Sequence, residues 1–468
     1  MTPPGLAAAL GKAREMSVGA DSFGFVSERW GREQVLGLAP DASSSKAAAG
    51  VAKPAKWGGA GCDEQAVWGE CQGSGSSVYR ACVDLSEPAF RCSCPSRKFP
   101  CKHALGLLLL WSDGVVPAGA QPGWADEWLT QRQEKSQKVQ ERREAARAEN
   151  AVSGTAKEGL TKKDPKTAER RERRVDDGID DLDRWLCDQI AHGLAQAEHA
   201  PYALWDDAAR RLVDAQAGAL AGQIKSLAAI PRHQGGGAGW PERLLEEYAL
   251  LRLLTRAYQR RAELPEPLQE TVRARVGFTM SQEEVLSGPT TRDRWYVTGI
   301  RDTEQDRLIT RRVWLRGLRA GRPALVLSFA APGRALDASL LVGTALDADL
   351  AFYPGAQPLR ALIGTRHAAP APAAPPGSTV GDFLREYARA LALDPWLDRW
   401  PAVLENVRLS RDRHLVDEHG DALPLDATDP WRLLAASGGG PMTIAGEWSP
   451  RGLRALSAWH DEEGVFFL

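Results

Sequence analysis

The stretch FRCSCPSRKFPCKHALGLLLLW, residues 90–111, contains three cysteines and a histidine and runs directly into an apolar segment. The four side chains form two closely spaced pairs, Cys92 with Cys94 and Cys101 with His103. Residues two apart on an extended chain project to the same side, so each pair is able to grip one ion. The loop between the pairs turns the second pair back onto the first. This spacing predicts a metal site.

Three thiolates and one imidazole form a closed tetrahedral ligand set, which is typical of a structural Zn²⁺ site. Pro95 and Pro100 bound the intervening loop and reduce the entropy that it loses on closure. Because no ligand position remains for water or substrate, the pattern favours a structural ion over a catalytic one. Two alternatives stay open: an iron–sulfur or redox site, and ordinary buried cysteines beside a surface histidine. We expect one structural zinc ion.

The flanking residues predict a small ββα unit. The segments SSVYRACVDL and PAFRCSC read as two strands around a turn at residues 86–88, and KHALGLLLLW has the length and composition of a short buried helix. All four candidate ligands lie between the second strand and this helix. A bound ion would therefore fasten the sheet to the helix.

The segment from about residue 78 to residue 111 resembles SWIM-type zinc fingers, in which a C-x-C pair, a variable gap and a C-x-H pair lead into a helix. The match holds at Cys92, Cys94, Cys101 and His103. The resemblance implies a ββα zinc module with a role in DNA binding or protein interaction. Some bacterial members of this group occur beside MoxR-type AAA ATPases and von Willebrand factor A proteins, which the resemblance suggests as protein partners.

The bulk composition is that of a globular protein. The chain has 468 residues, a formal net charge of −2 and seven cysteines. So few cysteines, in an odd number, argue against a secreted disulfide framework. The N-terminal residues have no basic segment followed by a long apolar core, and no apolar run is long enough to span a bilayer. We expect a cytoplasmic protein that does not enter a membrane.

Patterning along the chain predicts a multidomain α+β protein with an N-terminal zinc module, a central helical bundle and C-terminal β-rich regions. Apolar residues recur at helical spacing from Val175 to Leu194. From about Phe278 onward the apolar residues recur with the shorter period of β-strands. The segments VGDFLREYARALAL and WLDRWPAVLENV predict two helices after a Pro/Ala linker. The expected boundaries are 1–125 for the N-terminal domain, 126–175 for a basic helix and linker, 176–277 for the helical region, 278–366 for a β-rich domain, 367–377 for the linker and 378–468 for a C-terminal α+β unit.

Several other clusters have a structural interpretation that we prefer. Cys62, Cys71 and Cys82 lack a closely spaced pair and a fourth ligand, so they are expected to be core or loop thiols. Aspartates within residues 176–183 are expected to lie at the start of a helix, balanced by the arginines just upstream. Most of the tryptophans in strand-like segments, which include Trp431, are expected to fill cores, and the alternative is that a minority form an exposed patch for a partner.

Positive charge surrounds the metal motif, where cations and an aromatic ring are able to contact phosphates and stack on a base. The same cations would also balance an anionic zinc–thiolate centre. A second basic tract lies further along the chain. The residues are Arg91, Arg97, Lys98, Phe99 and Lys102 around the motif, and Lys162, Lys163, Arg170, Arg171, Arg173 and Arg174 in the tract.

The sequence favours a zinc-binding, non-enzymatic adaptor or scaffold with protein partners. The alternative is a nucleic-acid-binding protein that uses the metal motif and the basic tract. An enzyme with an unrecognised site in the β-rich regions is a third possibility, although no familiar catalytic motif and no small-molecule site is evident.

Overall fold

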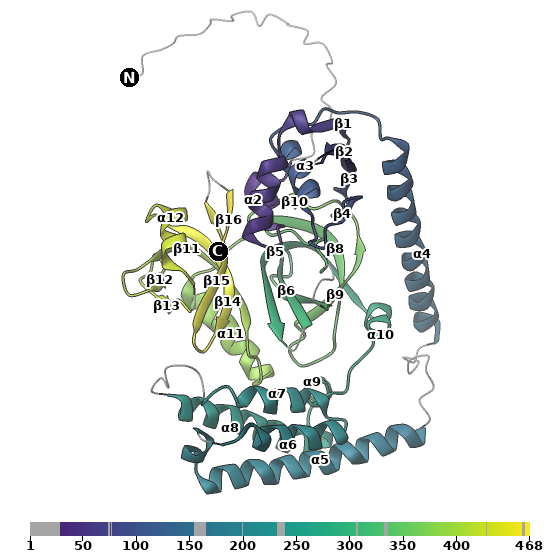
Figure 1. Ribbon diagram of the computed structural model, residues 1–468. Helices are drawn as coiled ribbons and strands as arrows, with labels where there is room; N and C mark the ends of the chain where they lie inside the picture. The colour runs from purple at the N-terminus through teal and green to yellow at the C-terminus, as the bar shows by residue number, and fades with distance from the viewer. Residues whose placement is uncertain are drawn as a thin grey trace, which may run out of the picture.

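The computed structural model describes residues 29–468, except 74, 76, 154–164, 199, 232–238, 306–307, 332–335, 427 and 461–463. Within these residues the chain forms three β-sheets and groups of helices, which confirms the predicted α+β class (Figure 1). The chain is arranged as an N-terminal unit, a helical bundle, a β-barrel and a C-terminal sheet unit. In the part of the chain that the structure describes, no helix combines the length and hydropathy required to cross a membrane.

The N-terminal unit packs helix α3 against an antiparallel sheet with the strand order β1-β2-β3-β4, and helices α1 and α2 pack on the other side of α3. The predicted strand–strand–helix order is present as β3, β4 and α3, but the prediction missed two strands because β1 is glycine-rich and shows no apolar alternation. The apolar run of α3 is buried along its whole length. The elements are α1 (Arg32–Gly37), α2 (Ala42–Val51), η1 (Pro54–Lys56), β1 (Trp57–Cys62), β2 (Ala66–Gln72), β3 (Val78–Asp84), β4 (Ala89–Cys92) and α3 (Lys102–Ser112).

A long helix, α4 (Gly123–Ser153), leaves this unit, and its first turns pack on the sheet through Ala125 and Leu129. The bundle that follows buries the predicted stripe from Val175 to Leu186, but Ile190 is 44% exposed and Leu194 lies beyond the end of the same helix, so the stripe is shorter than predicted. Its first helix begins at Pro165, earlier than the predicted boundary, and Lys162 and Lys163 lie outside the described residues. The bundle elements are α5 (Pro165–His192), η2 (Leu194–Glu198), α6 (Tyr202–Asp214), α7 (Gly218–Leu227), α8 (Trp240–Gln259), η3 (Arg261–Glu263) and α9 (Glu266–Val276).

The third unit is a closed five-stranded barrel with the cyclic order β8-β5-β6-β7-β9, in which β9 pairs with both β7 and β8. The predicted Pro/Ala linker contains a short strand, because Ala371 and Pro372 pair with β8. Proline is tolerated there because the strand lies at the edge of the sheet. The elements are α10 (Gln282–Ser287), β5 (Thr290–Gln305), β6 (Leu308–Gly317), β7 (Pro323–Ala330), β8 (Thr344–Phe352), β9 (Arg360–Arg366) and β10 (Ala371–Pro372).

The last unit is a six-stranded antiparallel sheet with the order β13-β12-β11-β14-β15-β16. The helix predicted over residues 396–407 is wrong, because most of that segment belongs to strand β11. The prediction that Trp431 lies in a strand and fills a core is also wrong, since this residue lies on a helix and its side chain is 75% exposed. The elements are α11 (Val380–Leu393), β11 (Trp400–Leu409), β12 (His414–Val416), β13 (Ala422–Pro424), α12 (Pro430–Ser437), β14 (Met442–Ser449), β15 (Gly452–His460) and β16 (Gly464–Phe467).

The N-terminal unit is joined directly to the two β units, since α1 contacts β16 of the C-terminal sheet and also the barrel unit. The buried amide of Gln34 in α1 donates hydrogen bonds to the carbonyl oxygens of Val342 and Gly343. Gly37 lies against the ring of Phe467, where a Cβ atom would be only 2.7 Å from the ring. The predicted metal motif therefore belongs to a unit that is packed onto the rest of the chain.

Candidate metal centre

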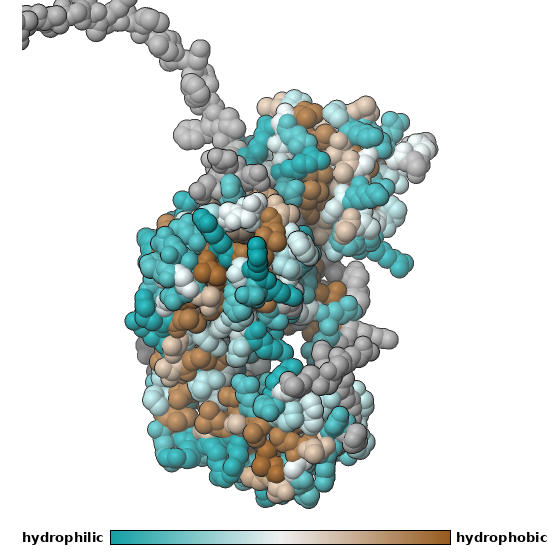
Figure 2. All heavy atoms as spheres, turned by 90° about the vertical axis from the view of Figure 1, so that its left-hand side faces the viewer, coloured by the Kyte–Doolittle hydropathy of each residue, from teal (hydrophilic) through white to brown (hydrophobic). Residues whose placement is uncertain are grey.

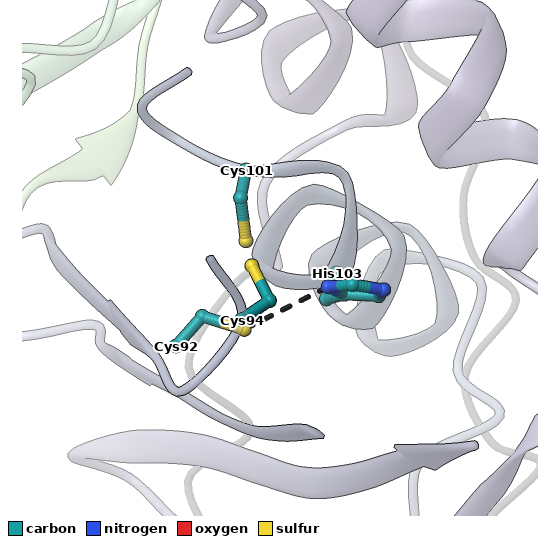
Figure 3. Close-up of side chains that lie close together, drawn as sticks. All are labelled: Cys92, Cys94, Cys101 and His103. Atoms are coloured by element: carbon teal, nitrogen blue, oxygen red, sulfur yellow. Dashed lines mark hydrogen bonds between the residues drawn. The ribbon is translucent and has the colours of Figure 1, made fainter. Parts of the chain in front are cut away.

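The structure brings the four predicted ligands together. Cys92 ends β4, Cys94 lies in the following loop, Cys101 is the N-cap of α3 and His103 occupies the first turn of that helix. One donor atom from each of the four lies within 4.8 Å of the others (Figure 3). These are the residues that the spacing of the motif singled out.

Backbone pairing fixes the first half of the site. Cys92 is opposite Ala81 in the β3–β4 ladder, and the next residue, Ser93, donates its amide to the carbonyl oxygen of Arg80. The hydroxyl of Ser93 also accepts a hydrogen bond from the Arg80 amide at 2.9 Å. The chain therefore leaves the sheet in a defined direction, with Cys94 just beyond the last paired residue.

The loop between the two pairs is tied to helix α2. Lys98 forms an ion pair of 2.7 Å with Asp41 and a hydrogen bond of 2.8 Å with Ser43. Asp41 is the N-cap of α2, where its carboxylate accepts the amide of Ser44. The Lys98 ammonium group holds the pKa of the Asp41 carboxyl well below its usual range. This contact positions the loop from outside the ligand set.

His103 is only 4% exposed, and its Nδ1 atom lies 3.8 Å from the sulfur of Cys92. The ring of Tyr79 stacks on the imidazole with centroids 4.9 Å apart and an interplanar angle of 29°. Sequence reasoning missed Tyr79 and Asp41. The strand period contains a signal for Tyr79, because it lies on the same face of β3 as Ala81, the partner of Cys92. No comparable signal marks Asp41.

The thiol groups interact strongly with one another. Hydrogen bonding from Cys92, followed by that from His103 and the helix amide of Ala104, lowers the pKa of Cys101 to about 4. The hydrogen bond with Cys101 and burial raise the pKa of Cys92, and burial raises that of Cys94. These interactions favour ionisation of Cys101 over that of Cys92 and Cys94, since like charges so close together repel.

This donor set fits Zn²⁺. Sulfur atoms at the corners of a tetrahedral zinc site with Zn–S of about 2.3 Å are about 3.8 Å apart, a spacing that a cluster of this size reaches with small side-chain movements. A divalent cation would also remove the penalty for ionising three neighbouring thiols. With all four positions supplied by the protein, the ion would tie strand β4 to helix α3. The site is consistent with one structural zinc ion.

The predicted basic residues around the site differ in their surroundings. Arg91, Arg97 and Lys102 are exposed, whereas Lys98 is engaged with Asp41. Phe99 is partly exposed but packs edge-on against the buried ring of Phe90, with centroids 5.8 Å apart. Three cations thus remain accessible beside the cage.

The other cysteines of this unit lie outside the ligand set. Cys62, Cys71 and Cys82 are buried, as expected for core thiols. The Cys62 thiol donates to the carbonyl oxygen of Val116 at 3.6 Å, and burial raises the pKa of Cys82 to about 12. These are properties of inert structural thiols.

The aspartates predicted at a helix start lie in the middle of α5, because that helix begins at Pro165. Their main partners come from other helices rather than from the upstream arginines. Asp183 pairs with Arg252 and Arg256 of α8, and Asp181 pairs with Arg211 of α6. The aspartates therefore form ion pairs that join α5 to other helices of the bundle.

Comparison with protein families finds a SWIM zinc finger over residues 82–111 and a SWIM-associated four-helix bundle domain over residues 170–276. No curated protein and no solved structure matches the chain. The first match contains all four metal-site residues, and the second covers nearly all of the bundle from α5 to α9. The chain therefore carries a SWIM zinc finger together with the four-helix bundle domain associated with it.

Proposed function

We propose that the protein is a zinc-dependent, non-enzymatic adaptor that holds protein partners together in the cytoplasm. The observation that carries the proposal is the ligand set, in which four protein side chains lie close enough together to supply all four positions of a tetrahedral ion. Such an ion stabilises a fold and has no coordination position for a substrate. The zinc module then serves to hold a rigid platform for surfaces elsewhere on the chain.

The helical bundle supplies a surface suited to a protein partner. Leu245, Ala249 and Leu253 recur every four residues on the exposed side of α8, so they form one apolar stripe. Figure 2 shows apolar side chains at the surface in the lower part of the view, where the bundle lies. Contiguous exposed apolar surface is a feature of interaction sites. By resemblance, an AAA ATPase acting with a von Willebrand factor A protein is the partner set that we propose.

Affinity purification of the zinc-loaded full chain from its native host, followed by mass spectrometry, tests this proposal. The chain should recover a defined partner, and the double substitution Leu245→Glu, Leu253→Glu should abolish recovery while leaving zinc content unchanged. Leu318→Glu, which alters an equally exposed leucine on a barrel turn, is the matched control. Recovery of no stable protein partner would contradict the adaptor role.

The second candidate is a nucleic-acid-binding protein, favoured by the exposed Arg91, Arg97 and Lys102 beside the cage. Binding to single- and double-stranded DNA and to RNA should then weaken steeply as salt rises, because phosphate contacts release counterions. The double substitution Arg91→Gln, Arg97→Gln should reduce the salt slope by about two. Lys98→Gln should change the slope less, because Lys98 is paired with Asp41. Absence of binding at low salt would remove this candidate.

A further inference from the structure

Four arginines converge where the barrel meets the C-terminal sheet. Arg301 of β5 and Arg312 of β6 are directly opposite each other in the barrel ladder. Arg454 of β15 is opposite Glu447 of β14, and Arg399 lies just before β11. Residues opposite each other in a ladder share one face, so each strand pair presents its two side chains together. The group formed by these four arginines and Glu447 is called the arginine cluster below.

Glu447 is the centre of the cluster and is 0% exposed. One of its carboxylate oxygens accepts the indole N–H of Trp314 at 2.9 Å. The other accepts a hydrogen bond from Arg301 at 2.5 Å and lies 3.6 Å from Arg399. The carboxylate is thus satisfied mainly by Arg301 and Trp314.

The positive charges of Arg312, Arg399 and Arg454 are only weakly balanced by nearby carboxylates. Arg312 and Arg399 approach the carboxylate of Asp398 only to 3.9 and 4.0 Å, beyond hydrogen-bonding distance, and that side chain is 76% exposed. The Nε atoms of Arg312 and Arg454 are buried without a hydrogen-bond partner among the described residues. Burial and the nearby guanidinium groups of Arg301 and Arg312 lower the pKa of Arg399.

Like charges directly opposite each other on neighbouring strands destabilise a sheet, so the pairing of Arg301 with Arg312 has an energetic cost. The nearby pair of Arg316 and Glu386 shows the alternative arrangement, in which two hydrogen bonds of 2.7 Å join one arginine to one carboxylate. The arginine cluster has four guanidinium groups, more than Glu447 and the neighbouring carboxylate of Asp398 match. An additional anion would relieve this excess.

We propose that the arginine cluster binds a small tetrahedral oxyanion, a phosphate or the phosphoryl group of a small molecule, and thereby joins the barrel to the C-terminal sheet. Guanidinium groups bind phosphoryl oxygens through paired N–H donors, which makes arginine the side chain suited to this chemistry. The side chains of Arg301, Arg312 and Arg399 are only 21%, 29% and 19% exposed. This enclosure favours a small anion over a polymer backbone.

Isothermal titration calorimetry of the zinc-loaded full chain tests the site at constant ionic strength. Sodium phosphate should give saturable binding, and Arg312→Gln and Arg454→Gln should each weaken it about tenfold, the effect of losing one charge-assisted hydrogen bond. Arg411→Gln, an exposed arginine of the same unit, should leave the binding constant unchanged. Adenosine monophosphate binding more tightly than phosphate would identify a phosphorylated small molecule, and equal affinities would identify free phosphate.

Wild-type protein that takes up no phosphate at concentrations up to about 10 mM would overturn the proposal. Unchanged affinity in both Arg312→Gln and Arg454→Gln would do the same. The two arginines lie on strands of different units, so a folding defect in one variant leaves the other informative. In chloride alone Arg312→Gln should melt no lower than wild type, since it removes the repulsion with Arg301.

Discussion

Cys101 connects the metal-binding loop to helix α3. It is buried, it forms the N-cap of the helix, and hydrogen bonds from Cys92 and His103 lower its pKa to about 4. The same hydrogen bonds favour the thiolate form, which is the form that binds a metal ion. The second pair of the motif therefore combines metal binding with helix initiation in one residue.

Cys94→Ser and Cys101→Ser should each release the zinc ion and unfold the N-terminal unit. Structural zinc in small modules contributes binding free energies of about 10 kcal/mol or more, and this energy is folding energy. Elemental analysis should find less than one zinc per chain, and limited proteolysis should cleave the unit while residues 170–276 stay resistant. Cys187→Ser, on the bundle helix α5, is the control that should retain zinc. An N-terminal unit as resistant as wild type would contradict the structural role.

Asp293 is a buried carboxylate that organises the turn after β6. Burial acts to raise its pKa, but amide hydrogen bonds from Ala320 and Arg319 outweigh this, so that the pKa is lowered overall. A lowered pKa means that the ionised form stabilises the folded state. This contribution is present above a pH of about 4 and is lost as the pH falls through the folded-state value.

Asp293→Asn should therefore reduce the free energy of unfolding by about 1–3 kcal/mol at neutral pH. The difference from wild type should shrink as the pH falls below about 4, because the unfolded wild-type chain then takes up a proton that the folded side chain, with its lowered pKa, still lacks. Urea unfolding at neutral pH and at about pH 3 measures both values. A difference that does not depend on pH would show that the charge of Asp293 is unimportant.

At the level of elements, helices α2 and α3 pack closely enough to require a glycine. A Cβ atom on Gly106 would lie 2.6 Å from the Cγ2 atom of Val51 and 3.2 Å from the carbonyl oxygen of Ala48. The close approach buries the apolar side of α3 and holds His103 at its first turn. The geometry of the metal centre thus depends on the spacing of two helices.

Gly106→Ala should destabilise the N-terminal unit by about 1 kcal/mol or more through overpacking. Gly50→Ala, in α2, is the matched control, because nothing lies within 4 Å of its added Cβ atom. That control should raise stability by up to about 1 kcal/mol through helix propensity. Thermal unfolding of the two variants, followed with zinc bound, compares them. Equal effects would refute the close packing.

Strand β11 shows why one predicted element was wrong. Trp400, Ala402 and Leu404 face the core shared with α11, whereas Val403 faces the core shared with the barrel. A strand covered on both faces has no alternation of polar and apolar residues, so its pattern resembles that of a helix. Pro401 was the available signal against a helix.

At the level of the whole molecule, the N-terminal unit is connected to the β units by a buried side chain far away in sequence. Gln34 accepts the amide of Gly31 at 2.7 Å and donates to the carbonyl oxygens of Val342 and Gly343. Because these groups are buried, removing the amide leaves two carbonyl oxygens without that donor. The packing of the zinc unit onto the barrel should depend on it.

Gln34→Ala should lower the unfolding free energy of this junction by about 1–3 kcal/mol. Hydrogen exchange should increase in α1 and around residues 341–344, while the metal centre keeps its zinc. Gln72→Ala, an exposed glutamine at the end of β2, should leave exchange unchanged. Unaltered protection in both segments would mean that the units are held together by other contacts.

The sequence by itself determined which residues form the metal centre, since Cys92, Cys94, Cys101 and His103 lie within one short segment and their spacing brings them together. It also determined the bundle stripe on α5, because helical periodicity is a local property. The tertiary structure decided the closure of the barrel, the two buried faces of β11 and the meeting of Arg301 with Glu447. Those features depend on contacts between residues far apart in the chain, and the burial and pairing that create them exist only once the units have packed.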